Sequence, residues 1–240
     1  MSFDVLPAAG RTERGGGDAP VRVVAAGKVY DARGAAPVRA LESVSLTVGR
    51  GEIVGLMGPS GCGKSTLLNL VGCVDLPTSG AVYVDGCETS SLGDDALTAL
   101  RRERVGTVFQ FFNLLPALTL AENVALPLVL QHVERGEIAR RVRAALDAVG
   151  IAERARAYPA QASGGQLQRA ALARATIHRP AIVLADEPTG NLDSHNGATV
   201  LRLLREFASK GQAILMATHA SEAAAICDRT LRMQDGRLIE

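Results

Sequence analysis

The stretch Gly58-Pro59-Ser60-Gly61-Cys62-Gly63-Lys64-Ser65-Thr66 decides the fold of this chain. It matches the spacing G-x-x-x-x-G-K-[ST] of the phosphate-binding P-loop. Its glycines remove side chains where phosphate oxygens approach the backbone, and they allow unusual backbone angles. A helix that begins at the end of such a loop points its free N–H groups at the anion. The stretch therefore predicts a nucleotide-phosphate site, with Lys64 as its positive charge and the Ser65 hydroxyl as a Mg²⁺ ligand.

The residues on either side of this loop predict a strand before it and a helix after it. Glu52 to Met57 is an apolar run typical of a buried strand, and residues 65–71 have the apolar content of a helix. The motif requires a strand, a glycine-rich loop and a helix in this order. An ordinary glycine-rich turn is the alternative. It is disfavoured because lysine occurs at only three positions in the chain, and one of them is Lys64.

Length and composition set limits on the class of protein. A chain of 240 residues, 47% of them apolar, is long enough for one α/β domain with a small inserted lobe. The formal net charge of +1 argues against a dedicated nucleic-acid binder, because such proteins carry a strong basic excess. No apolar run approaches the ~20 residues that span a bilayer. Residues 1–20 lack a signal-peptide pattern, so we expect a flexible tail and a cytoplasmic protein.

Polar side chains follow apolar, strand-like runs at several points further along the chain. In open α/β sheets, ligands bind at the carboxyl ends of the strands, so side chains placed there are candidates for a site. The candidates are Gln110, Asp186, Glu187 and His219. One carboxylate of the adjacent acidic pair can hold Mg²⁺ while the other orients or deprotonates an attacking water. An exposed acidic turn before Pro188 is the alternative for this pair.

A helical lobe is expected within the α/β core. Residues 119–130 and 137–149 have helical apolar spacing and no strand signal, which predicts an inserted lobe over about 113–165. The lobe ends at Ser163-Gly164-Gly165-Gln166, just before another helical run. A helix beginning here offers a second anion site, although Ser-Gly-Gly is also typical of ordinary loops. Ser194 is expected to be the N-cap of the following helix.

Residues 21–24 and 43–48, the second with strict alternation of apolar and polar residues, predict two strands of an antiparallel sheet with one covered face. Tyr30 lies between these two stretches. Its ring can stack on an adenine, or it can be an ordinary packed tyrosine, and the residues alone leave both readings open.

Three of the five phenylalanines flank Gln110, namely Phe109, Phe111 and Phe112. Core packing is one interpretation of this cluster. An apolar surface patch that docks a helix of a partner protein is the other.

The order of these motifs along the chain resembles the ATP-binding subunit of ABC transporters, and the resemblance covers about residues 21–240. It implies an α/β fold, with a P-loop NTPase core of mainly parallel sheet, an antiparallel β subdomain and the inserted helical lobe. In that family two subunits pair head to tail. Each ATP then lies between the P-loop of one subunit and the Ser-Gly-Gly-Gln signature of the other.

The resemblance also implies a role for each matching residue. Tyr30 would stack on adenine, and the phosphates would be held by Gly58, Ser60, Gly61, Cys62, Gly63, Lys64, Ser65 and Thr66. The Mg²⁺ ligands would be Ser65, Gln110 and Asp186. The catalytic set would be Glu187 as base, His219 as a switch at the γ-phosphate, and Gln110. The partner's ATP would be contacted by Ser163, Gly164, Gly165 and Gln166, with Asp193 at the dimer seam.

Within this family, the sequences of 109–119 and of Gly190-Asn191-Leu192-Asp193 resemble those of the branch that contains lipoprotein-release and macrolide-efflux exporters. This implies an ATPase at the cytoplasmic face of the membrane that works on separate integral membrane permease subunits. A soluble regulatory ATPase, such as a cell-division factor, is the alternative. Two residues depart from the family's signature, Ala162 in place of leucine and Leu167 in place of a polar residue. We expect a packing cost of at most ~1–3 kcal/mol from the smaller Ala162.

Overall fold

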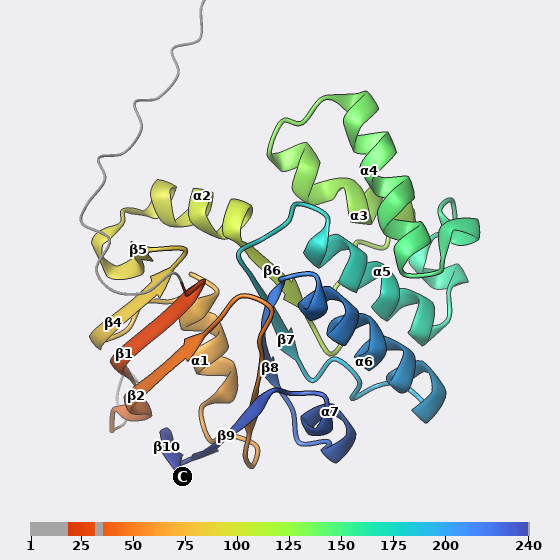
Figure 1. Ribbon diagram of the computed structural model, residues 1–240. Coiled ribbons are helices and arrows are strands. Elements are labelled where there is room, and N and C mark those ends of the chain that lie inside the picture. Colours follow the sequence, from red (N-terminus) through yellow and green to blue (C-terminus); the bar gives the residue numbers. More distant parts are fainter. Residues whose placement is uncertain (1–18, 32–35, 240) are drawn as a thin grey trace, which may run out of the picture.

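The computed structural model describes residues 19–31 and 36–239. The tail expected over 1–20 therefore lies almost wholly outside the described residues. Figure 1 shows two sheets with helix α1 between them and a group of helices on the far side of the larger sheet. The expected mainly parallel sheet and antiparallel subdomain are both present.

The larger sheet has the strand order β10-β9-β3-β8-β7-β6. Strands β9, β3, β8, β7 and β6 are parallel, and β10 pairs antiparallel with β9 in the hairpin that ends the chain. Its members are β3 (Ile53–Met57), β6 (Val105–Val108), β7 (Ile182–Asp186), β8 (Ala213–Ala217), β9 (Arg229–Gln234) and β10 (Arg237–Ile239). The order places β3, β8 and β7 side by side, so the residues that follow these strands meet at one edge.

The smaller sheet is antiparallel, with the order β2-β1-β4-β5. Its members are β1 (Val21–Tyr30), β2 (Val38–Val48), β4 (Ser79–Val84) and β5 (Cys87–Glu88). The antiparallel pairing expected for 21–24 with 43–48 is confirmed, but both strands are longer than predicted. Tyr30 is consequently the last residue of β1 and does not lie in a loop between the strands.

The helices connect and cover the sheets. They are α1 (Lys64–Val71), α2 (Asp94–Arg104), α3 (Leu120–Leu130), α4 (Arg135–Ala148), α5 (Gly164–Thr176), α6 (Ser194–Ser209) and α7 (Ser221–Ala225), with 3₁₀ turns at Thr89–Ser91, Ala152–Arg154 and Pro159–Gln161. The N-cap expected at Ser194 is wrong by one residue. Asp193 is the N-cap of α6, because its carboxylate accepts from the Asn196 backbone N–H at 2.8 Å.

The strands of the larger sheet are buried on both faces, which explains why their sequences are continuous apolar runs. Along β8, Leu215 packs toward α1 and the antiparallel sheet, whereas its neighbours Ile214 and Met216 pack toward the helices on the other face. This period-two division repeats along β7 and β3 and gives two cores, one on each side of the sheet.

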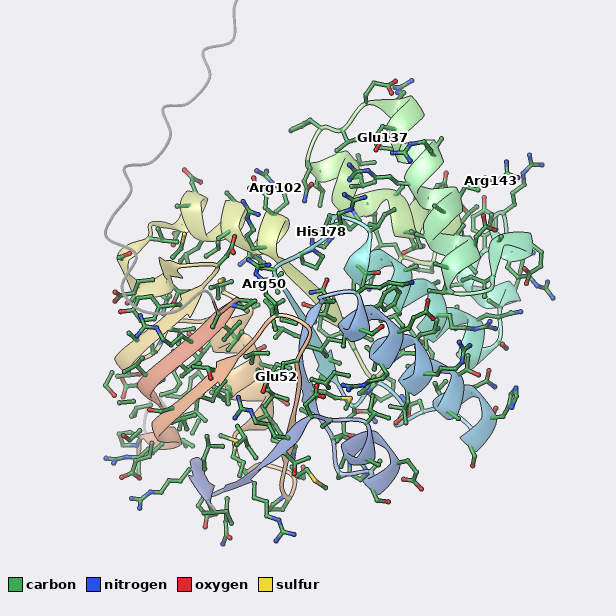
Figure 2. The ribbon with its side chains drawn as sticks, viewed as in Figure 1. Arg50, Glu52, Arg102, Glu137, Arg143 and His178 are labelled. Carbon is green, nitrogen blue, oxygen red and sulfur yellow. The ribbon has the colours of Figure 1, made fainter. Side chains whose placement is uncertain are left out.

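Residues 113–165 hold α3, α4 and two 3₁₀ turns, and their apolar side chains belong to the second core. Leu120, Val124 and Leu146 pack in the same cluster as Val183 of β7. The outer side of α4 is polar: Glu137 accepts from Arg140 and Arg141, which brings the pKa of Glu137 down to about 2, and Arg143 points away from the lobe (Figure 2). The helical segment therefore shares its core with the sheet.

Candidate nucleotide-binding site

Two glycines of the P-loop, Gly58 and Gly63, lie where side chains cannot fit. A Cβ on Gly58 would stand 2.2 Å from the carbonyl oxygen of Met233, and one on Gly63 would stand 2.6 Å from that of Ala40. Gly63 is also the N-cap of α1 with φ of 108°, a backbone angle that a side chain rarely adopts. The loop is therefore fixed from outside by β2 and β9, and its own surface stays bare.

The N-terminus of α1 opens into this bare surface. Ser60, Gly61 and Ser65 are exposed there, so backbone N–H groups at the start of the helix are accessible to an anion. The Nζ of Lys64 donates to the carbonyl oxygens of Gly58 at 2.7 Å and Pro59 at 2.9 Å. Cys62 is buried beneath the loop with 4% of its surface exposed, so only its backbone can reach a ligand. This cradle fits a nucleotide's phosphates.

The Ser65 hydroxyl lies 3.3 Å from Oδ2 of Asp186, the last residue of β7. Burial raises the pKa of Asp186, as does the nearby Glu187, while the Ser65 hydroxyl and Lys64 act in the opposite direction. A hydroxyl and a carboxylate that meet at a phosphate site are the oxygen donors that Mg²⁺ uses in P-loop proteins. These two residues therefore fit a Mg²⁺ ion.

Glu187 and His219 form a close pair at the same edge of the sheet. Oε1 of Glu187 lies 2.7 Å from Nδ1 of His219. Glu187 adopts φ of 46°, and its side chain is only 15% exposed, whereas that of His219 is 72% exposed. The backbone N–H of Glu187 donates to the carbonyl oxygen of Ala217 at the end of β8, and this bond holds the turn at Glu187 in place. A shielded carboxylate in a strained turn, beside a histidine, is suited to handling a proton.

Gln110 follows β6 and reaches the same region. The Nδ2 of Asn191 donates to the Gln110 carbonyl oxygen at 3.0 Å. The side-chain Nε2 of Gln110 lies 2.9 Å from where a Cβ on Gly190 would stand, so the glycine at 190 leaves room for the Gln110 amide. The structure thus brings Gln110 against the residues that follow Asp186 and Glu187.

Tyr30 lies at the rim of the site. Its ring is 39% exposed, its hydroxyl donates to Oδ2 of Asp75 at 2.9 Å, and the Nζ of Lys28 lies 5.0 Å from the ring centroid. Lys28 also donates to Oδ1 of Asp75 at 2.5 Å. The ring is therefore held at its hydroxyl end with Lys28 over it, and its partly exposed surface can receive a base.

Residues 163–166 begin α5 with a capping box. The Gln166 backbone N–H donates to the Ser163 hydroxyl at 3.3 Å, and the Ser163 N–H donates to the Gln166 side chain at 2.9 Å. A Cβ on Gly165 would stand 2.0 Å from Oδ1 of Asn196, so α5 packs closely on the start of α6, next to the capping Asp193. Residues 163–166 therefore lie beside the loop that leads into α6.

The two signature departures pack without disruption. Ala162 and Leu167 are both partly buried and lie against the second core. The aromatic cluster, in contrast, is largely on the surface, where Phe111 is 72% exposed and Phe109 is 38% exposed. The surface interpretation of these two phenylalanines is therefore the better one.

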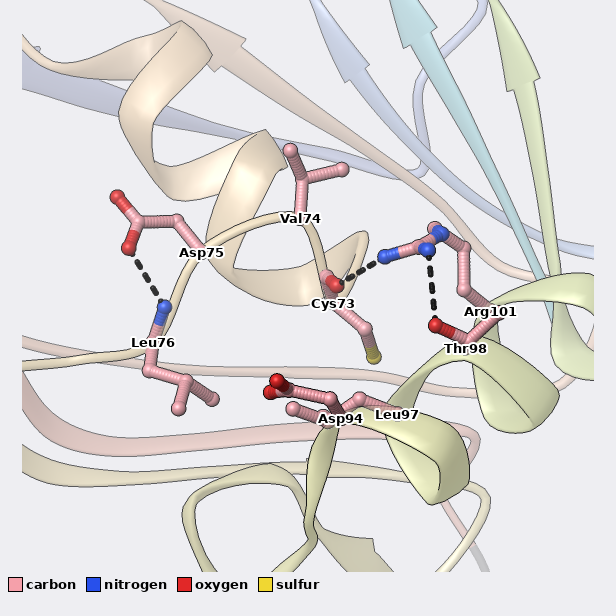
Figure 3. Close-up of a pocket in the computed structure, with 8 residues that line it drawn as sticks. All are labelled: Cys73, Val74, Asp75, Leu76, Asp94, Leu97, Thr98 and Arg101. Atoms are coloured by element: carbon pink, nitrogen blue, oxygen red, sulfur yellow. Dashed lines mark hydrogen bonds between the residues drawn. The ribbon is translucent and has the colours of Figure 1, made fainter.

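A hollow of about 380 Å³ lies at the other end of α1, between the residues after that helix and α2 (Figure 3). Arg101 spans it and donates to the Cys73 carbonyl oxygen at 2.8 Å. Since α1 has 8 residues, this hollow lies about 12 Å along the helix from the P-loop. None of the strand-end site residues lines it, but Asp75, which anchors Tyr30, does.

The family model described as "ABC transporter" matches residues 41–190, which includes the P-loop, the signature and both acidic residues. The chain belongs to the ABC transporter family. Its relatives include the lipoprotein-releasing system ATP-binding protein LolD of Bordetella avium, 47% identical over 88% of this chain and 92% of that protein. They also include the macrolide export ATP-binding/permease protein MacB of Rhodospirillum rubrum, 45% identical over 85% of this chain but only 31% of MacB.

Solved structures agree with this assignment. A dimeric ATP-binding cassette, MJ0796, in a post-hydrolysis state bound to ADP and Pi superposes with a TM-score of 0.84 at 40% identity, covering 92% of this chain and 97% of that one. The present chain is accordingly an ATP-binding subunit, an ATPase of the ABC transporter family. Within its described residues, no helix has the length and apolar character needed to cross a membrane.

Sequence reasoning missed several residues that organise the ABC site. They are Asp75, Gln168, Arg174 and Asn191, and each acts by a hydrogen bond to another site residue or to a loop backbone. Gln168 alone left a signal, because a glutamine that lies between Gly165 and Leu172 on the buried stripe of α5 has to find a polar partner inside.

Proposed function

We propose that two copies of this chain pair head to tail around two Mg-ATP and drive separate integral membrane subunits of an exporter or lipoprotein-extracting system. The observation that carries this proposal is the meeting of the P-loop, Asp186, Glu187, Gln110 and His219 at one sheet edge. The dimeric state of MJ0796 and the names of LolD and MacB support the pairing and the class of partner.

Each site residue has a role in this proposal. Lys64 and the N–H groups at the start of α1 bind the phosphates, and Tyr30 stacks on the adenine. Ser65, Gln110 and Asp186 hold Mg²⁺, which neutralises charge that develops on the phosphates. Glu187 accepts a proton from the attacking water, and His219 holds Glu187 until it turns to the γ-phosphate. Ser163, Gly164, Gly165 and Gln166 contact the ATP of the other copy, and Asp193 lies at the seam.

The membrane partner binds, in this proposal, at the exposed aromatic patch of Phe109 and Phe111, which places the protein at the cytoplasmic face of the membrane where ATP is supplied. Apolar side chains this exposed lose contact with water when a partner helix covers them.

The experiment is membrane association of the tagged chain in its host. Phe111→Asp should lower the membrane-bound fraction about tenfold, because a charge is placed in an apolar interface. Val38→Asp is the matched control, because Val38 is 58% exposed on β2, outside the patch. Equal membrane association of both variants and wild type would contradict docking at this patch.

A further inference from the structure

The loop from Phe109 to Asn113, which carries Gln110, has an unusual backbone. Phe112 and Asn113 are consecutive residues with positive φ, 61° and 49°. Asparagine tolerates this conformation, but a bulky side chain such as phenylalanine rarely adopts it. Such a conformation persists only where the surrounding structure holds it, so some contact must compensate for the strain at Phe112.

Arg174, on the last turn of α5, makes that contact. Its Nη1 donates to the Asn113 carbonyl oxygen at 2.6 Å, and its Nη2 donates to that of Phe112 at 3.0 Å. The guanidinium is half-buried, and it has no carboxylate within salt-bridge distance among residues 19–31 and 36–239. One planar guanidinium therefore bonds the backbone oxygens of both residues through two separate nitrogens held in a fixed geometry, which the single nitrogen of a lysine does not reproduce.

The first residue of the Phe109–Asn113 loop is also hydrogen-bonded to α5. Gln168 of α5 is fully buried, and its Nε2 lies 2.6 Å from the Pro188 carbonyl oxygen and 3.4 Å from that of Phe109. With the Asn191 bond to Gln110, the backbone oxygens of residues 109, 110, 112 and 113 all accept from side chains of α5 or of the turn after β7. The position of this loop is thus set from outside it.

We propose that Arg174 is a positioning residue that holds the Phe109–Asn113 loop in its strained conformation and so sets where Gln110 stands. The activity part of this inference rests on the proposed role of Gln110, whereas the loop conformation can be measured without it.

The experiment uses Phe111→Trp as the parent, since the chain contains no tryptophan of its own and position 111 is exposed. Anisotropy of this single tryptophan reports loop order. Arg174→Met should lower the anisotropy, and Arg174→Lys should lie between Met and the parent. Arg143→Met is the control, because Arg143 points away from the lobe (Figure 2), and it should leave the anisotropy unchanged.

We expect the Arg174 variants to change kcat and nucleotide affinity to different extents. Arg174→Met should lower kcat about tenfold while the affinity for a fluorescent ATP analogue changes less than about twofold, because Gln110 is misplaced and the phosphate cradle is untouched. Arg174→Lys keeps the charge and serves if the Met variant fails to fold.

The strain itself is tested at Phe112. Phe112→Gly and Phe112→Ala both remove the ring, but only glycine adopts positive φ without strain. Arg174→Met should therefore lower the anisotropy and kcat less in the Gly background than in the Ala background.

Unchanged anisotropy in both Arg174 variants, or equal effects in the two Phe112 backgrounds, would overturn the proposal. A lowered anisotropy in Arg174→Met with an unchanged kcat would instead count against the proposed role of Gln110, and the anisotropy would still decide the role of Arg174.

Discussion

Glu187 and His219 contact each other before any nucleotide contacts either of them. Their 2.7 Å pairing means that the exposed histidine covers a carboxylate that is itself well shielded. The backbone of Glu187, with its strained φ, is fixed by its N–H bond to the end of β8, whereas its carboxylate is held by His219. Losing the charge at Glu187 and losing the side chain of His219 should therefore have different effects.

Glu187→Gln removes the proton acceptor but keeps the size of the side chain. Steady-state ATP hydrolysis should fall at least about a hundredfold, while ATP-dependent dimers persist on size-exclusion chromatography. Glu222→Gln, on the exposed side of α7, is the matched control and should retain wild-type turnover. Normal turnover in Glu187→Gln would remove this residue as the base.

Asp75 anchors Tyr30, and its charge gives a pH-dependent prediction. Burial tends to raise the pKa of Asp75, but its bonds from Lys28 and Tyr30 outweigh burial and lower it. A carboxyl with a lowered folded-state pKa contributes stability above its unfolded pKa of about 4 and loses it as pH falls through the folded value.

Asp75→Asn should thus lower the free energy of unfolding by about 1–2 kcal/mol at pH 7. The difference from wild type should shrink below about pH 4. Urea unfolding at several pH values measures it, and a difference that is constant from pH 7 to pH 3 would show that the carboxylate charge is not involved.

At the scale of elements, apolar runs located the strands of the parallel sheet well, and β3 differs from the predicted run of Glu52 to Met57 by one residue at its start. The antiparallel strands were predicted too short for a specific reason. Ala25 and Ser43 have φ of 44° and 51° at register shifts in the β1–β2 pair, so alternation breaks where the predicted strands ended at 24 and began at 43.

The sequence predicted the site residues that follow strands but not the residues that hold them in place. Residues that follow strands, such as Asp186 and His219, were found because a parallel sheet brings such residues to one edge. Arg174 and Asp75 were not found, because a side chain that bonds to a distant backbone oxygen or hydroxyl leaves no periodic pattern in the sequence.

Packing of β6 on α5 gives a prediction at this scale. A Cβ on Gly106 would stand 1.9 Å from the carbonyl oxygen of Ala175, so Gly106→Ala should lower the free energy of unfolding by about 1–3 kcal/mol. Gly197→Ala in α6 meets only ordinary contacts, and helix propensity should make it neutral or stabilising by up to about 1 kcal/mol. Thermal or urea unfolding measures the change in the free energy of unfolding for both variants. Equal changes would contradict this account of the close packing at Gly106.

At the scale of the whole molecule, the proposed function requires one chain to present two different halves of a nucleotide site. The P-loop lies between β3 and α1, whereas the signature begins α5 and packs beside Asn196 at the start of α6. Ser163 and Gln166 currently satisfy each other in the capping box, so they are not engaged with this chain's own P-loop. A second copy turned head to tail brings one half to the other, as the proposed function requires.

The most direct test of this central claim is the Mg²⁺-dependent ATPase rate of the purified chain across a wide range of protein concentration. If each site is shared by two copies, the rate per molecule should rise with concentration and level off once dimers predominate. A rate per molecule that is constant from the dilute limit upward would contradict the account, because a single copy would then contain a complete site.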